Sequence, residues 1–402
     1  MRLVVMLATI TAAALTVQAP VAIGFPRTAA VRDACGAARP GYARCFAKIR
    51  TDVHSGHMTA AALPAGYGPA DLRSAYNLPI TGGGAQTVAV VDAYDDPNAE
   101  SDLATYRTTY GLPACTTANG CFHKVNGSGA ASPLPPADEG WGLEISLDLD
   151  MVSAACPDCR VLLVEGASAA IADLATAEAT AASLGANEIS NSYGIQEDPA
   201  MLPFQDAYRH PGVAIVAAAG DSGYGIPEFP AVLASVIAVG GTRLTRVPTA
   251  ARRWAETAWG GSSTTGGTGS GCSAWIAKPT WQHDPNCSGR MTADVAADAD
   301  PDTGPAVYDS YGSDGGPGWT IVGGTSASSP FIAGVIALAG NPTAFPDASY
   351  LYAHTDALND ITSGTNVTSP SGMDCGGDYQ CNSLSGYDGP TGEGTPNGPA
   401  SF

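Results

Sequence analysis

The sequence has few charged residues and, among them, few basic ones. Only 14% of its 402 residues are charged, and 18 Lys and Arg stand against 38 Asp and Glu, which gives a formal net charge of −20. A surface that binds nucleic acid needs Lys and Arg to replace the counterions of the phosphate backbone. The charge balance therefore argues against nucleic acid as a partner and predicts a solvated acidic surface. With 45% hydrophobic residues, the chain can still bury a large core.

Long apolar runs are also missing beyond the first residues. The chain opens MRLVVMLATITAAALTV, in which a single Arg precedes an apolar stretch and small residues. This pattern is typical of a secretory signal peptide, and the run is shorter than the roughly 20 residues that a membrane-spanning helix needs. We expect a signal peptide over residues 1–24, with cleavage between Ala19 and Gly24. We expect the mature protein to be secreted, extracellular and not associated with a membrane.

Ten cysteines fall into close pairs along the chain. The pairs are Cys35 with Cys45, Cys115 with Cys121, Cys156 with Cys159, Cys272 with Cys287, and Cys375 with Cys381. An even number of closely spaced cysteines after a signal peptide predicts five local disulfides. The Cys-Pro-Asp-Cys pair is also compatible with a zinc or redox site. However, no further Cys or His pair supplies the remaining zinc ligands, and the motif ends a predicted helix instead of beginning one.

The chain changes character near residue 68. Residues 25–67 are polar and irregular and predict a short pro-segment or N-terminal arm, whereas residues 68–402 predict one large domain. Short β-branched runs bounded by Gly, Asp or Pro predict strands at residues 87–92, 160–165, 189–193, 213–218, 236–239 and 319–322. Helices are expected at residues 100–110, 143–155, 171–184 and 325–338. This alternation predicts an α/β fold with a mostly parallel sheet flanked by helices, and sites in such folds gather at the carboxyl ends of the strands.

The most informative stretch is Gly323-Gly-Thr-Ser326-Ala-Ser-Ser-Pro330. It lies between a predicted strand and an apolar helix, so Ser326 is expected in the first turn of that helix. There the positive end of the helix dipole favours a developing oxyanion, and the glycines allow close approach of a substrate backbone. A Ser at a helix start is often only an N-cap. The full Gly-Thr-Ser-x-x-x-Pro string before an apolar helix is more specific and is typical of the nucleophile of subtilisin-like peptidases.

Histidine, the usual base beside such a serine, is scarce. The six histidines are His54, His57, His123, His210, His283 and His354, and none stands in a His-Gly-Thr context at a helix start. If Ser326 is a nucleophile, another group must activate it.

Glu144 and Asp148 are candidates for that group, because residues four apart share one face of a helix. The apolar residues around them leave little of this helix for water. Two carboxyls in one partly buried site push one pKa upward and share a proton. Glu144 would then serve as a base at acidic pH, oriented by Asp148. The alternative is a pair of solvated helix carboxylates.

A third acidic residue, Asp221, directly follows the strand expected at residues 213–218, in the string Ala219-Gly-Asp221-Ser-Gly. A protonated Asp at this strand end would donate a hydrogen bond to a tetrahedral oxyanion. On local grounds, a turn Asp that bonds its own backbone is an equal alternative.

These motifs together resemble the sedolisin family of serine-carboxyl peptidases. Glu144-x-x-x-Asp148, Ala219-Gly-Asp221-Ser-Gly and Gly324-Thr-Ser326-x-x-x-Pro330 occur in the family's order, and the resemblance runs from about residue 70 to the C-terminus. It implies a subtilisin-like fold and a monomeric serine-type endopeptidase that acts on proteins or peptides at acidic pH. It also implies that Ser326 is the nucleophile, Glu144 the base, Asp148 its orienting partner and Asp221 part of the oxyanion hole. Substrate would bind along Ser192, Tyr193, Gly194 and Gly220.

The family also has a calcium site near its C-terminus, built from an Asp-Ile pair and a Gly-x-Asp segment. The resemblance implies carboxylate ligands from Asp360 and Asp388 and carbonyl ligands from Ile361, Leu384 and Gly386, a set of hard oxygens that suits calcium. Leu384 stands where Gly is usual, which matters little for a carbonyl ligand. A glycine-rich turn cluster without metal is the alternative.

Two features depart from the family pattern. Only about 45 residues separate the expected signal peptide from the large domain, whereas the family has a long folded pro-domain. Asp92 stands where subtilisins keep their catalytic Asp, and without a matching His we interpret it as structural or as part of the cleft rim. The remaining alternatives are a Ser-His-Asp peptidase that uses Asp92, a non-catalytic secreted binding protein on the same fold, and a calcium-stabilised structural protein.

Overall fold

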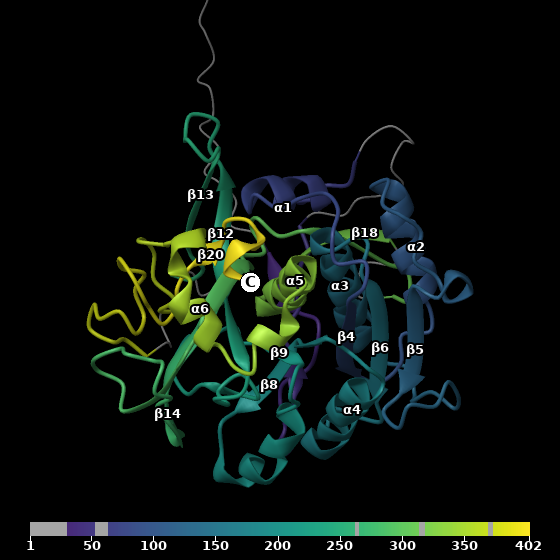
Figure 1. Ribbon diagram of the computed structural model, residues 1–402, viewed down its shortest axis with the longest axis horizontal. Coiled ribbons are helices and arrows are strands. Elements are labelled where there is room, and N and C mark those ends of the chain that lie inside the picture. The colour runs from purple at the N-terminus through teal and green to yellow at the C-terminus, as the bar shows by residue number, and fades with distance from the viewer. Residues whose placement is uncertain (1–29, 53–62, 262–264, 313–317, 369–372) are drawn as a thin grey trace, which may run out of the picture.

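The computed structural model describes residues 30–52, 63–261, 265–312, 318–368 and 373–402, so the expected signal peptide lies outside the described residues. At the centre is an eight-stranded sheet with the order β13-β12-β9-β7-β4-β6-β5, and β16 also pairs with β12 (Figure 1). The bounds are β4 Thr87–Ala93, β5 Phe122–Asn126, β6 Arg160–Gly166, β7 Glu188–Asn191, β9 Ala214–Ala218, β12 Ile237–Arg246, β13 Trp254–Ala258 and β16 Val295–Asp298. Every pairing in it is parallel except β12 with β13. The predicted mostly parallel sheet is therefore confirmed.

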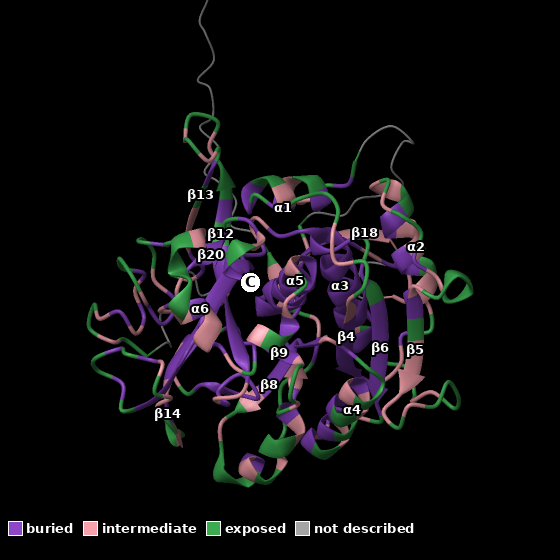
Figure 2. Cartoon of the chain, in the orientation of Figure 1, coloured by how far each residue is buried: buried purple, intermediate pink, exposed green. Residues whose placement is uncertain are grey.

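Helices cover both faces of this sheet. Helices α3 (Glu139–Ala155) and α5 (Thr325–Ala339) pack against each other and share one apolar cluster with Val88 and Val90 of β4. Ala89 and Val91 of the same strand belong to the cluster of α4 (Ile171–Ser183) on the other face, because successive side chains of a strand point to opposite faces. Figure 2 shows α3, α5 and the central strands almost entirely buried. The remaining α-helices are α1 Pro69–Ala75, α2 Ala99–Thr109 and α6 Ser349–Ala353.

Two predicted strands differ from the structure. The strand expected at residues 189–193 is interrupted at Ser192, where the chain leaves β7 and begins β8 (Tyr193–Gln196), which belongs to another sheet. The strand expected at residues 319–322 exists as β18 (Gly318–Gly323), but it runs antiparallel to β17 (Ala306–Asp309) and lies outside the parallel sheet. Assigning this strand to the parallel sheet was wrong, since an apolar run does not reveal the direction of its partner.

The N-terminal arm is more regular than its sequence suggests. Three short strands form, β1 (Val31–Asp33), β2 (Arg44–Cys45) and β3 (Lys48–Arg50). Strand β3 pairs with β1 and with β18, and β2 pairs with β8. The arm thus adds strands to two sheets of the large domain.

All five predicted disulfides are present, with Cα–Cα distances between 4.8 and 5.8 Å. The Cys156–Cys159 pair closes the end of α3, as expected. In the described part of the chain, no helix combines the length and the apolar character that a bilayer crossing requires.

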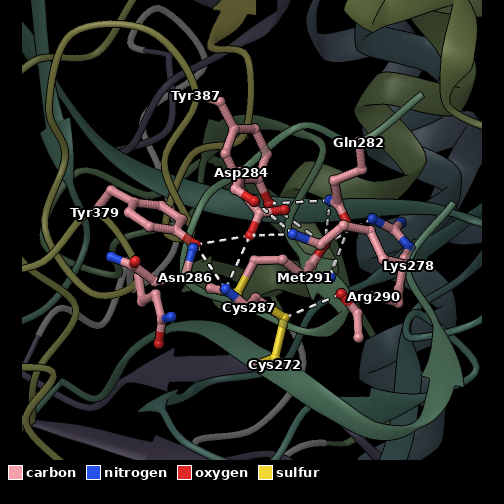
Figure 3. Close-up of polar contacts among 12 residues, drawn as sticks. Cys272, Lys278, Gln282, Asp284, Asn286, Cys287, Arg290, Met291, Tyr379 and Tyr387 are labelled. Atoms are coloured by element: carbon pink, nitrogen blue, oxygen red, sulfur yellow. Dashed lines mark hydrogen bonds and ion pairs between the residues drawn. A yellow bond between two sulfur atoms is a disulfide. The ribbon is translucent and has the colours of Figure 1, made fainter. Parts of the chain in front are cut away.

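Figure 3 shows polar contacts around the turn after β14, where the last part of the chain lies beside it. The Tyr379 hydroxyl donates to Asp284 Oδ2 over 2.7 Å, and Asp284 also pairs with Lys278 at 2.9 Å. The Gln282 amide donates to the carbonyl of Met291 over 2.8 Å. The first of these contacts ties the turn after β14 to the C-terminal segment, and the other two hold that turn itself. The smaller strands are β10 Ser222–Tyr224, β11 Glu228–Phe229, β14 Gly267–Ala277, β15 Gly289–Thr292, β19 Leu358–Asn359 and β20 Thr395–Pro396.

Candidate active site

Ser326 lies in the first turn of α5, as the sequence predicts. Strand β18 ends at Gly323, Gly324 adopts φ +97°, and the helix begins at Thr325. Ser326 is fully buried, and its hydroxyl donates to the carbonyl of Ser192 over 3.2 Å. The positive φ explains the glycine at position 324, because other residues rarely adopt this conformation. The turn directs the Ser326 hydroxyl toward the chain between β7 and β8.

Glu144 and Asp148 lie one turn apart on α3, the helix that packs against α5. Both are fully buried, as are all residues of this helix from Trp141 to Ala155. Asp148 Oδ1 accepts a hydrogen bond from the Ser192 hydroxyl over 2.9 Å, and Glu144 Oε2 accepts one from the Ala47 N–H over 2.8 Å. The alternative of solvated helix carboxylates is therefore wrong.

The environment favours protonation of both carboxyls. Burial raises the pKa of Glu144 well above its usual range, and the nearby Asp92 adds to this effect, while hydrogen bonding by Ser326 and Ala47 opposes it. Burial raises the pKa of Asp148 as well, again with help from Asp92 and from Glu144. Neighbouring carboxyls in a low-dielectric site cannot all ionise, so they titrate as a coupled group.

Asp92 also belongs to this coupled set of carboxyls, although the sequence did not predict it there. It is the penultimate residue of β4 and is fully buried, so its interpretation as part of the cleft rim was wrong. Burial raises the pKa of Asp92 to about 8. Among the described residues, no N–H or O–H donates to either oxygen of Asp92, to Glu144 Oε1 or to Asp148 Oδ2. Its position at the carboxyl end of a parallel strand was the available signal.

Asp221 follows β9 and Gly220 and reaches the start of α5. Its Oδ1 accepts hydrogen bonds from the Thr325 N–H over 2.8 Å and from the Thr325 hydroxyl over 2.9 Å. No donor reaches Oδ2 within the described residues, and a Cβ atom at Gly324 would lie 2.8 Å from it. Burial raises the pKa of Asp221 to about 6, although Lys48 lowers it. The carboxyl is thus held by one oxygen while the other faces the turn before Ser326.

The expected substrate-binding residues do not all lie along one strand. Ser192 offers its carbonyl beside Ser326, and Tyr193 and Gly194 pair with β2 of the N-terminal arm. A Cβ atom at Gly194 would lie 2.8 Å from Phe46 Cζ, so this position needs glycine. Gly220 instead donates its N–H to the Thr325 hydroxyl over 3.1 Å. It therefore supports the loop that holds Asp221.

The histidines lie elsewhere. His210 and His354 hydrogen-bond to carbonyl oxygens of Ala207 and Tyr350. His123 stands on β5, the edge strand, and His283 lines a pocket beside Trp281. None of the histidines in the described ranges hydrogen-bonds to Ser326 or to the carboxyls of Glu144, Asp148 and Asp92. His54 and His57 lie outside those ranges.

The residues expected to bind calcium come together in two adjoining loops. Asp360 Oδ2 accepts from the Gly386 N–H over 3.0 Å, and the buried Asp388 accepts from the Leu384 N–H over 3.1 Å. Burial raises the pKa of Asp388 to about 8; hydrogen bonds from Thr391 and Leu384 oppose this shift, and Asp360 adds to it. Among the described residues, no N–H or O–H donates to the carbonyls of Ile361, Leu384 or Gly386. Two neighbouring carboxyls beside carbonyls that accept no hydrogen bond from the described residues fit a hard cation.

Comparisons with known proteins identify the family and the fold. A family model, the subtilase family (peptidase S8), matches residues 145–359. Kumamolisin from Bacillus sp. (strain MN-32) is 31% identical in an alignment 343 residues long, which covers 76% of this chain and 58% of kumamolisin. This chain therefore spans little more than half the length of that relative.

Solved structures share the fold. A complex of Pseudomonas sedolisin, a serine-carboxyl proteinase, with two molecules of pseudo-iodotyrostatin aligns with a TM-score of 0.68 at 22% identity, over 84% of this chain and 96% of that one. Sphericase aligns with a TM-score of 0.52 at 19% identity, over 84% of this chain and 99% of its own. The fold is therefore subtilisin-like, as predicted. The chain belongs to the subtilase family. It is similar to kumamolisin in sequence and to Pseudomonas sedolisin in fold.

Proposed function

We propose that this protein is a secreted serine-carboxyl endopeptidase that hydrolyses peptide bonds at acidic pH. The observation that best supports this proposal is the contact between two buried helices, one with Ser326 in its first turn and the other with Glu144 and Asp148. The five disulfides support secretion, since such bonds persist in oxidising compartments.

In the proposed reaction, Ser326 Oγ attacks the substrate carbonyl and Glu144 takes its proton. Asp148 holds Glu144 in position and shares a proton with it and with Asp92. Glu144 then protonates the leaving amine. Its contact with the peptide N–H of Ala47, at 2.8 Å, supports this role. Water hydrolyses the acyl-enzyme in the second half of the reaction, with Glu144 again as base.

The oxyanion of the tetrahedral intermediate would form at the amino end of α5, beside Asp221. There Asp221 Oδ2 must carry a proton to donate to the oxyanion. Because the pKa of Asp221 is raised to about 6, this proton is present in acid and lost toward neutrality. Glu144, in contrast, has to ionise for the first proton transfer. The rate is therefore expected to peak on the acid side.

We also propose one structural calcium ion in the loops that contain Asp360 and Asp388. Asp360 and Asp388 would contribute carboxylate oxygens, and Ile361, Leu384 and Gly386 would contribute carbonyl oxygens. When bound, calcium would neutralise the two carboxylates and fix the two loops.

Digestion of a peptide library from pH 3 to pH 9 tests the proposed function, with Ser326→Ala as the matched control. We expect internal cleavage of peptides in acid, absent from the variant. A rate that reaches its plateau in alkali and vanishes below about pH 6 would indicate a histidine base and contradict the proposal.

A further inference from the structure

A second pocket, separate from the candidate active site, lies beside the C-terminal segment. Its volume is about 390 Å³, and its lining includes Trp281, Tyr352, Tyr387 and Glu393. Small-molecule sites in proteins commonly have volumes of about 300–1,000 Å³. None of these four residues takes part in the proposed peptidase reaction, so the pocket needs its own explanation.

The pocket lies near the amino end of a central strand. The Arg290 guanidinium lies over the Trp281 ring, 5.1 Å from its centroid, and is paired with the fully buried Asp294. Arg290 also donates to the carbonyl of Val236 over 3.3 Å, just before β12 begins. Strand β12 runs parallel to β9, and Asp221 of the candidate active site follows the carboxyl end of β9. A ligand in this pocket would therefore lie outside the substrate cleft.

Three aromatic rings form walls of the pocket. The ring centroids of Trp281 and Tyr352 are 4.7 Å apart, and those of Tyr352 and Tyr387 are 5.7 Å apart. The Tyr352 hydroxyl donates to Asp294 over 2.9 Å, and the Tyr387 hydroxyl accepts from the Gln282 amide over 3.3 Å (Figure 3). Both tyrosines are half-buried, and their hydroxyls are engaged inside the protein. They therefore present ring surface to the pocket, in fixed positions.

Glu393 gives the pocket an uncompensated negative charge. Within the described ranges, no N–H or O–H donates to its carboxyl and no cation pairs with it. The other acidic or basic side chains in the lining are Asp284, which pairs with Lys278 at 2.9 Å, and the exposed His283. A neutral ligand would cover the Glu393 carboxylate without giving it a partner, which is costly. The pocket is therefore suited to a cation.

The aromatic walls indicate which kind of cation fits. A hard metal ion needs several oxygen ligands to replace its water, and rings do not supply them. An ammonium group that carries methyl or methylene groups is attracted both by a carboxylate and by the faces of aromatic rings, on which its alkyl groups pack. Its charge would lie beside Glu393 and its carbon atoms against the rings.

We propose that this pocket binds an organic ammonium group between Glu393 and the rings of Trp281, Tyr352 and Tyr387. The group belongs either to a free quaternary amine or to a lysine side chain, since the two share this chemistry. The proposal goes beyond the peptidase function and does not depend on it.

Calorimetric titration of Ser326→Ala, which cannot digest itself, tests the proposal. Burial raises the pKa of Glu393 to about 7, and Asp294 and Asp360 add to this effect. We therefore choose pH 8, with calcium present throughout so that the proposed site in the loop of Asp360 is already filled. The probes are choline, its uncharged isostere 3,3-dimethylbutanol, and a Gly-Lys-Gly peptide with blocked ends. We expect choline to bind, and the isostere to bind at least about tenfold more weakly because it lacks the charge.

Variants separate the charge from the rings. Glu393→Gln keeps the shape of the side chain and should weaken choline binding by about tenfold or more. Asp206→Asn, which removes an exposed carboxylate elsewhere, should bind choline as before. Tyr352→Leu should weaken binding by about threefold or more, whereas Tyr352→Phe keeps the ring and should retain it. If Tyr352→Leu fails to fold, Glu393→Gln and the uncharged isostere decide.

The outcomes also identify the source of the ammonium group. Binding of choline alone assigns the pocket to free quaternary amines, whereas binding of the peptide, with or without choline, assigns it to lysine side chains. Equal affinity for choline and its isostere, or unchanged affinity in Glu393→Gln, would contradict the proposal. Absence of binding by both choline and the peptide at millimolar concentrations would also show it to be wrong. The proposed peptidase function stands in either case.

Discussion

The hydroxyl of Ser192 donates a hydrogen bond to Asp148 over 2.9 Å at the point where the chain passes from β7 to β8. This bond favours the ionised form of Asp148 against the effect of burial. The carbonyl oxygen of Ser192 also accepts a hydrogen bond from the Ser326 hydroxyl. Ser192 thus contacts both the proposed nucleophile, Ser326, and Asp148, one of the three buried carboxyls.

Ser192→Ala should move the acid limb of the pH–rate profile upward. Without the hydroxyl, the pKa of Asp148 rises further. The three coupled carboxyls of Glu144, Asp148 and Asp92 then lose their first proton at higher pH. A hydrogen bond to a charged group contributes about 1.5 kcal/mol, which corresponds to about one pH unit. The profile of kcat/KM against pH measures this shift. Ser192→Thr keeps the hydroxyl and should leave the limb in place, and an unmoved limb in Ser192→Ala would contradict the coupling.

Glu144→Gln and Asp148→Asn should each lower kcat by about a thousandfold or more, because each removes a member of one catalytic unit. Such losses do not add. The double variant Ser326→Ala with Glu144→Gln should therefore be no slower than Ser326→Ala. Single-turnover rates on one peptide provide the comparison. The control is Glu178→Gln, which should keep its activity. Glu178 is a buried carboxyl of α4, on the opposite face of the sheet. A triad variant with near-normal turnover would refute the assignment.

Asp221→Asn should extend activity toward neutral pH. The wild-type donor is lost as pH rises through about 6, whereas an Asn amide keeps its protons and can still accept from Thr325 through its oxygen. Asp221→Ala removes the donor entirely and should cost about a hundredfold or more in kcat. Rates from pH 3 to pH 8 distinguish the two variants. If the alkaline limb of Asp221→Asn coincides with that of the wild type, another group sets that limb.

The folded protein should be more stable in acid than at slightly alkaline pH. Burial raises the pKa of Glu178 to about 8 and that of Glu188 well above its usual range. The native state therefore binds protons that the unfolded chain releases. This stabilisation is complete below the unfolded pKa of about 4.3 and is lost as pH rises through about 8. Scanning calorimetry of Ser326→Ala, which cannot digest itself, should give a lower Tm at pH 8 than at pH 4.5.

Glu178→Gln removes one of these carboxyls and should raise Tm at pH 8 by an amount equivalent to roughly 1–3 kcal/mol, with little change at pH 4.5. Asp206→Asn, at an exposed position, should change neither value. A Tm of Ser326→Ala that is higher at pH 8 than at pH 4.5 would overturn the sign of this prediction.

Chelation should destabilise the protein if Asp360 and Asp388 hold calcium. A ligand at a hundred times its Kd contributes about 2.7 kcal/mol to the free energy of unfolding. Removal of the ion with a chelator should therefore lower Tm by several degrees, and added calcium should restore it. Asp360→Asn in the Ser326→Ala background should abolish the response. Melting curves that coincide with and without chelator would contradict the proposed calcium site.

The sequence correctly predicted the strands and helices that short apolar runs mark by themselves. The strands β4, β6 and β9 are short apolar runs, and α3 and α5 are apolar helices with clear starts. Strand β12 extends to Arg246, well beyond its apolar run, because its polar end pairs with β13. A run of side chains does not specify such a partner.

The N-terminal arm shows the same limit more clearly. Its strands contain polar residues such as Arg44, Lys48 and Arg50, and their pairing depends on β8 and β18, which lie more than a hundred residues away in the chain. Asp92 was missed for a related reason, since only the folded sheet brings it beside Glu144. In both cases the decisive neighbour is distant in the sequence.

The packing of α3 against α5 also determines how the enzyme responds to heat. The proposed nucleophile and its carboxyl partners lie on the two most deeply buried helices, and no surface loop has to order before they meet. Local opening of a protein rarely reaches such elements, whose amides exchange with solvent only through global unfolding. Thermal inactivation and loss of structure should therefore follow a single curve, and amide exchange in α3 should be as slow as anywhere in the chain.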